Sequence, residues 1–196
     1  MPANPSNAAA ASGRRTGLLG FARNRRGAIL VEMALLLPLL VMLLLGTFEL
    51  GRYVLLHQKL SRLASNAGDL AARADSLSAG DLNQIFSAAE YLAQPFELGN
   101  NGLLIISSVG ASGTPDPEVN WQQSGGGTGS GSSAIGSPGS TATLPSGLEL
   151  RADQNVIIAE VIYSYVPYFF DNVIDAQEIY QVAVHRPRFG PLTEIQ

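Results

Sequence analysis

The chain has 196 residues, of which 46% are hydrophobic and only 14% are charged. Soluble domains usually carry about 25% charged residues, so the composition predicts a membrane segment beside one modest folded domain. Cysteine is absent, which excludes disulfides, thiolate nucleophiles and cysteine-ligated metals.

Basic residues gather at the N-terminus. Residues 1–27 contain five arginines and no acidic residue, whereas residues 52–196 contain seven basic and fourteen acidic residues. Short cytoplasmic flanks of membrane helices are enriched in Lys and Arg. We therefore expect residues 1–27 to be a basic cytoplasmic leader and the acidic remainder to be extracytoplasmic. Nucleic-acid binding by the arginines is the alternative, but the apolar run that follows them favours the topological interpretation.

The apolar run covers residues 28–48 and reads AILVEMALLLPLLVMLLLGTF, with Glu32 as its only charged residue. An α-helix rises about 1.5 Å per residue and the hydrocarbon core is about 30 Å thick, so about 20 residues suffice to cross it. We predict a single transmembrane helix here, in the cell inner membrane. A cleaved secretory signal would have a shorter apolar core and an A-x-A-like end, which Gly46-Thr47-Phe48 does not match.

Two residues inside this run are unusual. A carboxylate in a bilayer is costly, which makes Glu32 a functional candidate, although it can also snorkel toward the cytoplasmic headgroups. Pro38 removes one helical N–H and crowds the carbonyl of Ala34. It predicts a kink, which either assists helix packing or is a passive bend.

A set of motif residues surrounds the run. A basic leader ends at Gly27, V-E-M-A-L follows at residues 31–35, and Pro38 interrupts the leucines. A distal G-x-x-E-x-G-R is formed by Gly46, Glu49, Gly51 and Arg52. Over roughly residues 25–53 the sequence resembles the N-terminus of the TadE/TadG-like pseudopilins of the Tad (tight adherence) Flp pilus system. Met33 stands where Phe is commoner in that family, and Leu30 is bulkier than usual.

The resemblance implies that a prepilin peptidase cuts after Gly27 and leaves Ala28 as the mature N-terminus. Glycine suits a scissile position because it lacks the Cβ that resists extended or strained backbone. The new ammonium would lie one helical turn from Glu32, and opposite charges about 4 Å apart attract by about 4 kcal/mol at an effective dielectric of about 20. Glu32 is thus the candidate subunit-register carboxylate, pairing with its own amine or a neighbour's.

The resemblance also implies the partners and the role. Besides the lipid bilayer, the partners are a prepilin peptidase, other pilins or pseudopilins and the pilus assembly platform. The size of the outer domain implies a minor pilin or an assembly factor. The alternative is an unprocessed single-pass membrane protein whose extracytoplasmic domain binds an envelope or surface partner.

Helical periodicity continues beyond the span. Apolar residues at steps of three and four from Tyr53 to Ala74 predict that residues 49–77 extend the long helix with an amphipathic half. Ser78 and Asp81 form a capping-box-like start of a second helix, and Pro95 lies beyond its end. Its expected apolar face consists of Leu82, Ile85, Phe86, Ala89 and Leu92.

The remaining pattern predicts strands. Apolar or β-branched runs at residues 103–109, 118–123, 156–166 and 177–185 are typical of short strands. The Gly- and Ser-rich residues 124–147 between them predict a flexible surface loop. We therefore expect residues 78–196 to form a small α+β domain with a mostly antiparallel sheet packed on helices.

Motifs for enzyme chemistry are missing from the sequence. The glycines of residues 125–131 lack the G-K-[ST] of a phosphate loop, and Lys59 is the only lysine. His57 and His185 have no metal-ligand spacing, and both are expected at the surface. The sequence thus predicts no enzyme, no metal site, no cofactor and no small-molecule substrate.

Overall fold

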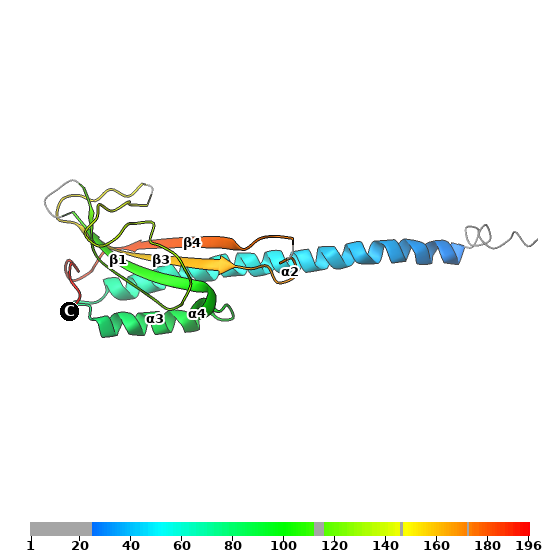
Figure 1. Ribbon diagram of the computed structural model, residues 1–196, viewed down its shortest axis with the longest axis horizontal. Helices are drawn as coiled ribbons and strands as arrows, with labels where there is room; N and C mark the ends of the chain where they lie inside the picture. Colours follow the sequence, from blue (N-terminus) through cyan, green and yellow to red (C-terminus); the bar gives the residue numbers. More distant parts are fainter. Residues whose placement is uncertain (1–24, 112–115, 146, 172) are drawn as a thin grey trace, which may run out of the picture. The chain divides into compact units, whose positions relative to one another are not determined.

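The computed structural model describes residues 25–111, 116–145, 147–171 and 173–196. The chain has an α+β fold, as the sequence predicted (Figure 1). The predicted leader lies outside the described residues as far as residue 24. The elements in chain order are α2 (Arg25–Ala72), α3 (Ala79–Ala93), α4 (Leu98–Asn101), β1 (Gly102–Gly110), β2 (Glu118–Gly125), β3 (Asn155–Tyr165) and β4 (Gln177–His185).

The chain divides into two compact units, residues 1–48 and 49–196. In the first unit, the large apolar side chains from Ile29 to Leu44 are between 41% and 73% exposed. By length and composition this stretch of α2 fits a single membrane span or a signal segment. The helix continues through Pro38, so the expected kink stays a prediction.

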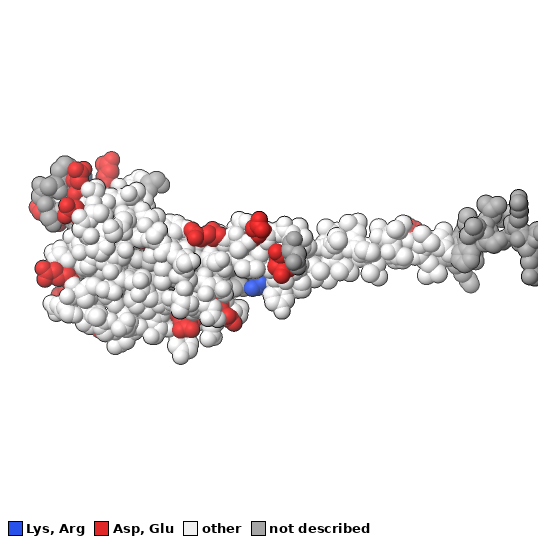
Figure 2. All heavy atoms as spheres, viewed as in Figure 1, with Lys and Arg blue, Asp and Glu red and all other residues white. Residues whose placement is uncertain are grey.

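The second unit is built around a four-stranded sheet with the order β2-β1-β3-β4. Every neighbouring pair is antiparallel, which confirms the predicted sheet. β3 is buried from Val156 to Tyr163, so both of its faces are covered. This explains why β3 is rich in β-branched residues on both faces, because a strand with one solvated face would alternate apolar and polar residues. Acidic side chains are scattered over the face of this unit seen in Figure 2.

Helices cover one face of the sheet. From α2, Leu56, Leu60 and Leu63 are buried, and they belong to one core with β-strand residues such as Ile106 and Val161. The predicted amphipathic half of the long helix therefore packs on its own domain. Two details differ: α2 ends at Ala72 rather than residue 77, and Leu70 is exposed.

The second helix, α3, starts as its sequence predicted. The Ser78 hydroxyl accepts a hydrogen bond from the Asp81 N–H at 3.2 Å, and the Asp81 carboxylate accepts one from the Ser78 N–H at 3.0 Å. This reciprocal capping box satisfies two donors that the first helical turn leaves without partners. The expected apolar face was wrong at Leu92, which is exposed, because the buried stripe continues from Ala89 to Ala93.

A glycine lets α2 approach the sheet closely. A Cβ at Gly68 would lie 2.7 Å from His185 Cδ2 and 3.3 Å from Ala159 Cβ. Any side chain at position 68 would therefore push α2 away from β3 and β4. His185 is the last residue of β4 and is partly buried.

The other face of the sheet is covered by the Gly- and Ser-rich segment after β2, which crosses the strands in Figure 1. Ile135 and Ala142 from this segment are buried with Val109, Val119 and Ile158. The expected surface position of residues 124–147 therefore does not hold at Ile135 and Ala142. The expected flexibility stays a prediction.

Several glycines in this segment serve close packing. A Cβ at Gly127 would lie 2.1 Å from the Gly102 carbonyl oxygen, and one at Gly129 would lie 2.7 Å from the same atom. A Cβ at Gly131 would lie 2.7 Å from Ile162 Cδ1. The backbone thus lies directly on the start of β1 and on β3, and at Gly127 and Gly129 an added Cβ would meet backbone atoms.

Candidate functional site

The residues proposed for processing, Gly27 and Ala28, lie near the start of the described part of α2. Ala28 and Glu32 are exposed, and no hydrogen bond or ion pair joins Glu32 to another described residue.

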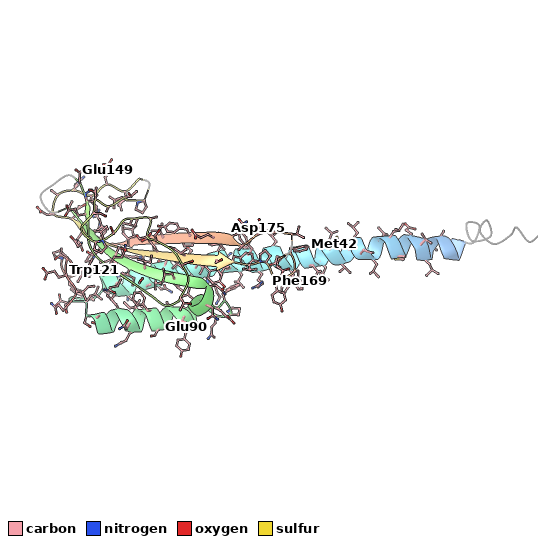
Figure 3. The ribbon with its side chains drawn as sticks, in the orientation of Figure 1. Met42, Glu90, Trp121, Glu149, Phe169 and Asp175 are labelled. Atoms are coloured by element: carbon pink, nitrogen blue, oxygen red, sulfur yellow. The ribbon has the colours of Figure 1, made fainter. Side chains whose placement is uncertain are left out.

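Of the distal motif residues, Glu49, Gly51 and Arg52 lie in the second unit, where Glu49 is almost fully buried with 7% of its surface exposed. Its carboxylate accepts a hydrogen bond from the hydroxyl of Tyr165, the last residue of β3. It also accepts hydrogen bonds from the backbone N–H groups of Tyr168 at 3.0 Å and Phe169 at 3.1 Å. Glu49 therefore ties α2 to the connection between β3 and β4, where Figure 3 labels Phe169.

Arg52, one helical turn along, completes this cluster. Its Nη1 lies 3.6 Å from Glu49 Oε1. Its guanidinium carbon lies 5.4 Å from the ring centre of Tyr168 and 5.8 Å from those of Tyr165 and Phe96. The planar guanidinium of Arg52 thus pairs with a carboxylate and also packs on aromatic rings. Lysine would be a poor substitute, because its ammonium group is not planar.

The surroundings set the protonation states of this pair. Burial opposes the charge on Glu49, but the hydrogen bonds from Tyr165, Phe169 and Tyr168 and the charge of Arg52 outweigh it and lower the pKa of its carboxyl. Burial and the Glu49 carboxylate raise the pKa of Tyr165 to about 12. At neutral pH the pair is therefore a carboxylate that accepts from a neutral phenol.

The contacts extend along the same face of α2. The Tyr53 ring lies 5.2 Å from that of Tyr165 and 4.6 Å from that of His57, both in edge-on geometry. His57 Nδ1 lies 3.2 Å from Gln181 Nε2 on β4. The expectation that His57 is a solvated surface residue was therefore wrong. His57 lies two helical turns beyond Glu49 and therefore on the same side of α2. Sequence periodicity shows which residues share a face, but it does not show that a strand packs against that face.

A second buried carboxylate, Glu160 in the middle of β3, is fully inaccessible to solvent. It accepts hydrogen bonds from the Ser133 hydroxyl, from the Ala134 N–H at 2.8 Å and from the Tyr180 hydroxyl at 2.8 Å. Glu160 thus joins the Gly- and Ser-rich segment to the sheet. Sequence reasoning gave it no role, although an acid within the apolar run of β3 was the available signal.

Neither carboxylate has the surroundings of a catalytic acid or base. The oxygens of Glu49 and Glu160 are occupied by structural donors, which leaves little capacity for a substrate proton. Within the part of the chain that the structure describes, no group of three His, Cys, Asp or Glu residues is placed to hold a metal ion. The arrangement holds the domain together around α2.

The comparisons agree with the position of the motif residues. The TadE-like protein family matches residues 27–69, which include Gly27, Glu32, Glu49 and Arg52. No curated protein and no solved structure matches the chain. The match ends within α2, so the sheet lies outside it. Over residues 27–69, about a fifth of its length, the chain is similar to the TadE-like protein family.

Proposed function

We propose that the chain is a pseudopilin or minor pilin, processed after Gly27, that acts in assembly of a Tad-type pilus. The observation that carries this proposal is the exposed apolar half of α2, preceded by a basic leader and Gly27. The match of residues 27–69 to the TadE-like family supports it. TadE-like proteins are generally pilus components rather than enzymes, and the occupied carboxylates of this domain agree with that role.

In the proposed arrangement, residues 1–27 are cytoplasmic, residues 28–48 cross the inner membrane and the sheet domain is extracytoplasmic. A prepilin peptidase reaches the bond after Gly27 at the cytoplasmic membrane surface. Cleavage gives Ala28 a free ammonium, and the exposed Glu32 carboxylate neutralises it within the protein or between subunits. The proposed partners are that peptidase, other pilins or pseudopilins, and the assembly platform.

The mature N-terminus tests the proposal directly. The protein is extracted from membranes of cells with an active prepilin peptidase, and its intact mass and N-terminal sequence are determined. We expect the chain to begin at Ala28. A matched pair of variants locates the site: Gly27→Val should retain the leader, whereas Gly20→Val, the same change within the leader, should be processed normally.

The alternative function gives a different result in the same experiment. An unprocessed single-pass protein would keep its leader in wild-type form and still fractionate with membranes. Retention of the leader in cells that trim their other pilins would therefore overturn the processing proposal. Association with sheared pili distinguishes a filament component from an assembly factor that stays in the membrane.

A further inference from the structure

The connection between β3 and β4 exposes an unusual number of apolar side chains. Val166, Tyr168 and Val173 are 51%, 71% and 81% exposed, and Phe169 and Ile174 are 42% and 45% exposed. The backbone there is turned back on itself, since the Val173 and Ile174 N–H groups both donate to the Phe170 carbonyl. We call residues 166–171, 173 and 174 the apolar loop. Burying such side chains in an apolar phase is favourable, because each removes apolar area from water.

The apolar loop is held next to the residue at which the proposed span ends. Glu49 directly follows residues 28–48, and its carboxylate binds the loop through the N–H groups of Tyr168 and Phe169. On α2 itself, Leu50 and Val54 are also exposed, at 63% and 46%. The second unit therefore has exposed apolar side chains on the first turns of α2 after residue 48 as well as on the apolar loop.

We propose that the apolar loop lies in the headgroup layer of the outer leaflet and contacts lipid with Val166, Tyr168, Val173 and Ile174. Tyrosine is enriched at this depth, because its ring is apolar and its hydroxyl reaches water. Asp171 and Asp175 on the same connection limit the depth, because the cost of a carboxylate is high at the bilayer centre and falls toward the interface. The lipid contact gives the domain a second attachment to the membrane.

The inference rests on the proposed span but not on cleavage after Gly27. Full-length protein is reconstituted into vesicles of phosphatidylethanolamine and phosphatidylglycerol, with phosphatidylcholine brominated on its acyl chains as the quencher. Co-flotation with the vesicles first shows whether α2 has inserted. Tyr168→Trp and Val173→Trp are then compared with wild-type protein, whose buried Trp121 supplies the background fluorescence.

Phe189→Trp is the matched control, since Phe189 is an aromatic residue that is 69% exposed. It lies at the other end of the domain, because the N–H of the preceding Arg188 donates to the carbonyl of Ala72, the last residue of α2. Glu49 and Ala72 are separated by about 35 Å along the helix axis at about 1.5 Å per residue. Lipid contact at the apolar loop therefore does not by itself bring Phe189 to the bilayer.

We expect brominated lipid to quench the added tryptophan at positions 168 and 173 and to leave the one at 189 unaffected. Bromines near the glycerol end of the acyl chains should quench more than bromines near the methyl end. Protein that floats with vesicles but shows equal quenching at all three positions would overturn the inference while leaving the span intact. The inference would also be overturned if brominated lipid did not quench tryptophan at positions 168 and 173 and the apolar loops of two copies could be crosslinked to each other.

Discussion

The hydroxyl of Tyr165 donates a hydrogen bond to the carboxylate of Glu49, across 116 positions of sequence. Glu49 lies within the segment that matches the TadE-like family, whereas Tyr165 lies in the sheet outside it. The matched segment therefore includes a structural contact of the sheet domain as well as the apolar run. Because both groups are buried, removing either leaves the other without its partner.

Double-mutant analysis should detect this pair. We expect Glu49→Gln and Tyr165→Phe each to lower the free energy of unfolding by about 1–3 kcal/mol. The double variant should lose less than the sum, with a coupling of about 0.5–3 kcal/mol. Unfolding of full-length protein in detergent, followed by Trp121 fluorescence, provides the measurement. Glu178→Gln, at an exposed acid on β4, is the control, and strict additivity would argue against the contact.

The same pair predicts a pH dependence with two limbs. The pKa of Tyr165 is raised to about 12, so its contribution is complete below its unfolded-state pKa of about 10 and is lost as pH rises toward 12. The pKa of Glu49 is lowered, so its contribution is present above its unfolded-state pKa and is lost as pH falls through the folded-state value. Tyr165→Phe should flatten the alkaline limb of the stability profile, and Glu49→Gln the acid limb. Unchanged slopes in both variants would contradict the assignment.

Glu160 should control the order of the segment that covers the second face of the sheet. Glu160→Ala leaves the Ser133 and Tyr180 hydroxyls and the Ala134 N–H without their acceptor, which should cost about 1–3 kcal/mol. The segment around Ser133 should then become accessible to proteases. Limited proteolysis with mass spectrometry locates the cuts. Glu149→Ala, which changes an exposed acid, should leave the cleavage pattern of the wild-type protein unaltered.

Two glycines of α2 should respond in opposite directions. Gly68→Val places methyl groups against His185 and Ala159 and should destabilise the domain by about 1–3 kcal/mol. Gly51 has no heavy atom within 4 Å of an added Cβ, so Gly51→Ala should stabilise the helix by up to about 1 kcal/mol. Thermal unfolding in detergent compares them. Equal effects of the two substitutions would mean that α2 does not pack on the sheet through Gly68.

Glu32 should act in assembly and not in processing. Glu32→Gln removes the charge while keeping the shape, so the ammonium at Ala28 loses a partner worth about 4 kcal/mol at an effective dielectric of about 20. We expect normal removal of the leader and reduced piliation, scored by N-terminal sequencing and by the yield of sheared pili. Glu32→Asp, which keeps the charge, should be less impaired. Normal pili from the Gln variant would rule out the pairing.

Local sequence patterns predicted the helices and strands well, but they did not predict contacts between residues distant in sequence. The β-branched run of β3 and the capping box at Ser78 each depend on neighbouring residues, so they are readable from sequence. The bond between Glu49 and Tyr165 depends on how α2 meets β3, and nothing near either residue specifies it. The glycine-rich segment was mispredicted for a different reason. Glycine is common in flexible linkers, but Gly127 is a glycine because the backbone packs closely on Gly102.

The packing of the glycine-rich segment determines where this protein can be labelled. An epitope or fluorophore would ordinarily be inserted into such a stretch, but an insertion near Gly127 or Gly129 would lift the backbone off the first residue of β1. Gly139 and Gly147 are better positions for an insertion, because no heavy atom lies within 4 Å of a Cβ added at either one. Tags at those two positions should report the location of the protein in the cell without unfolding its sheet domain.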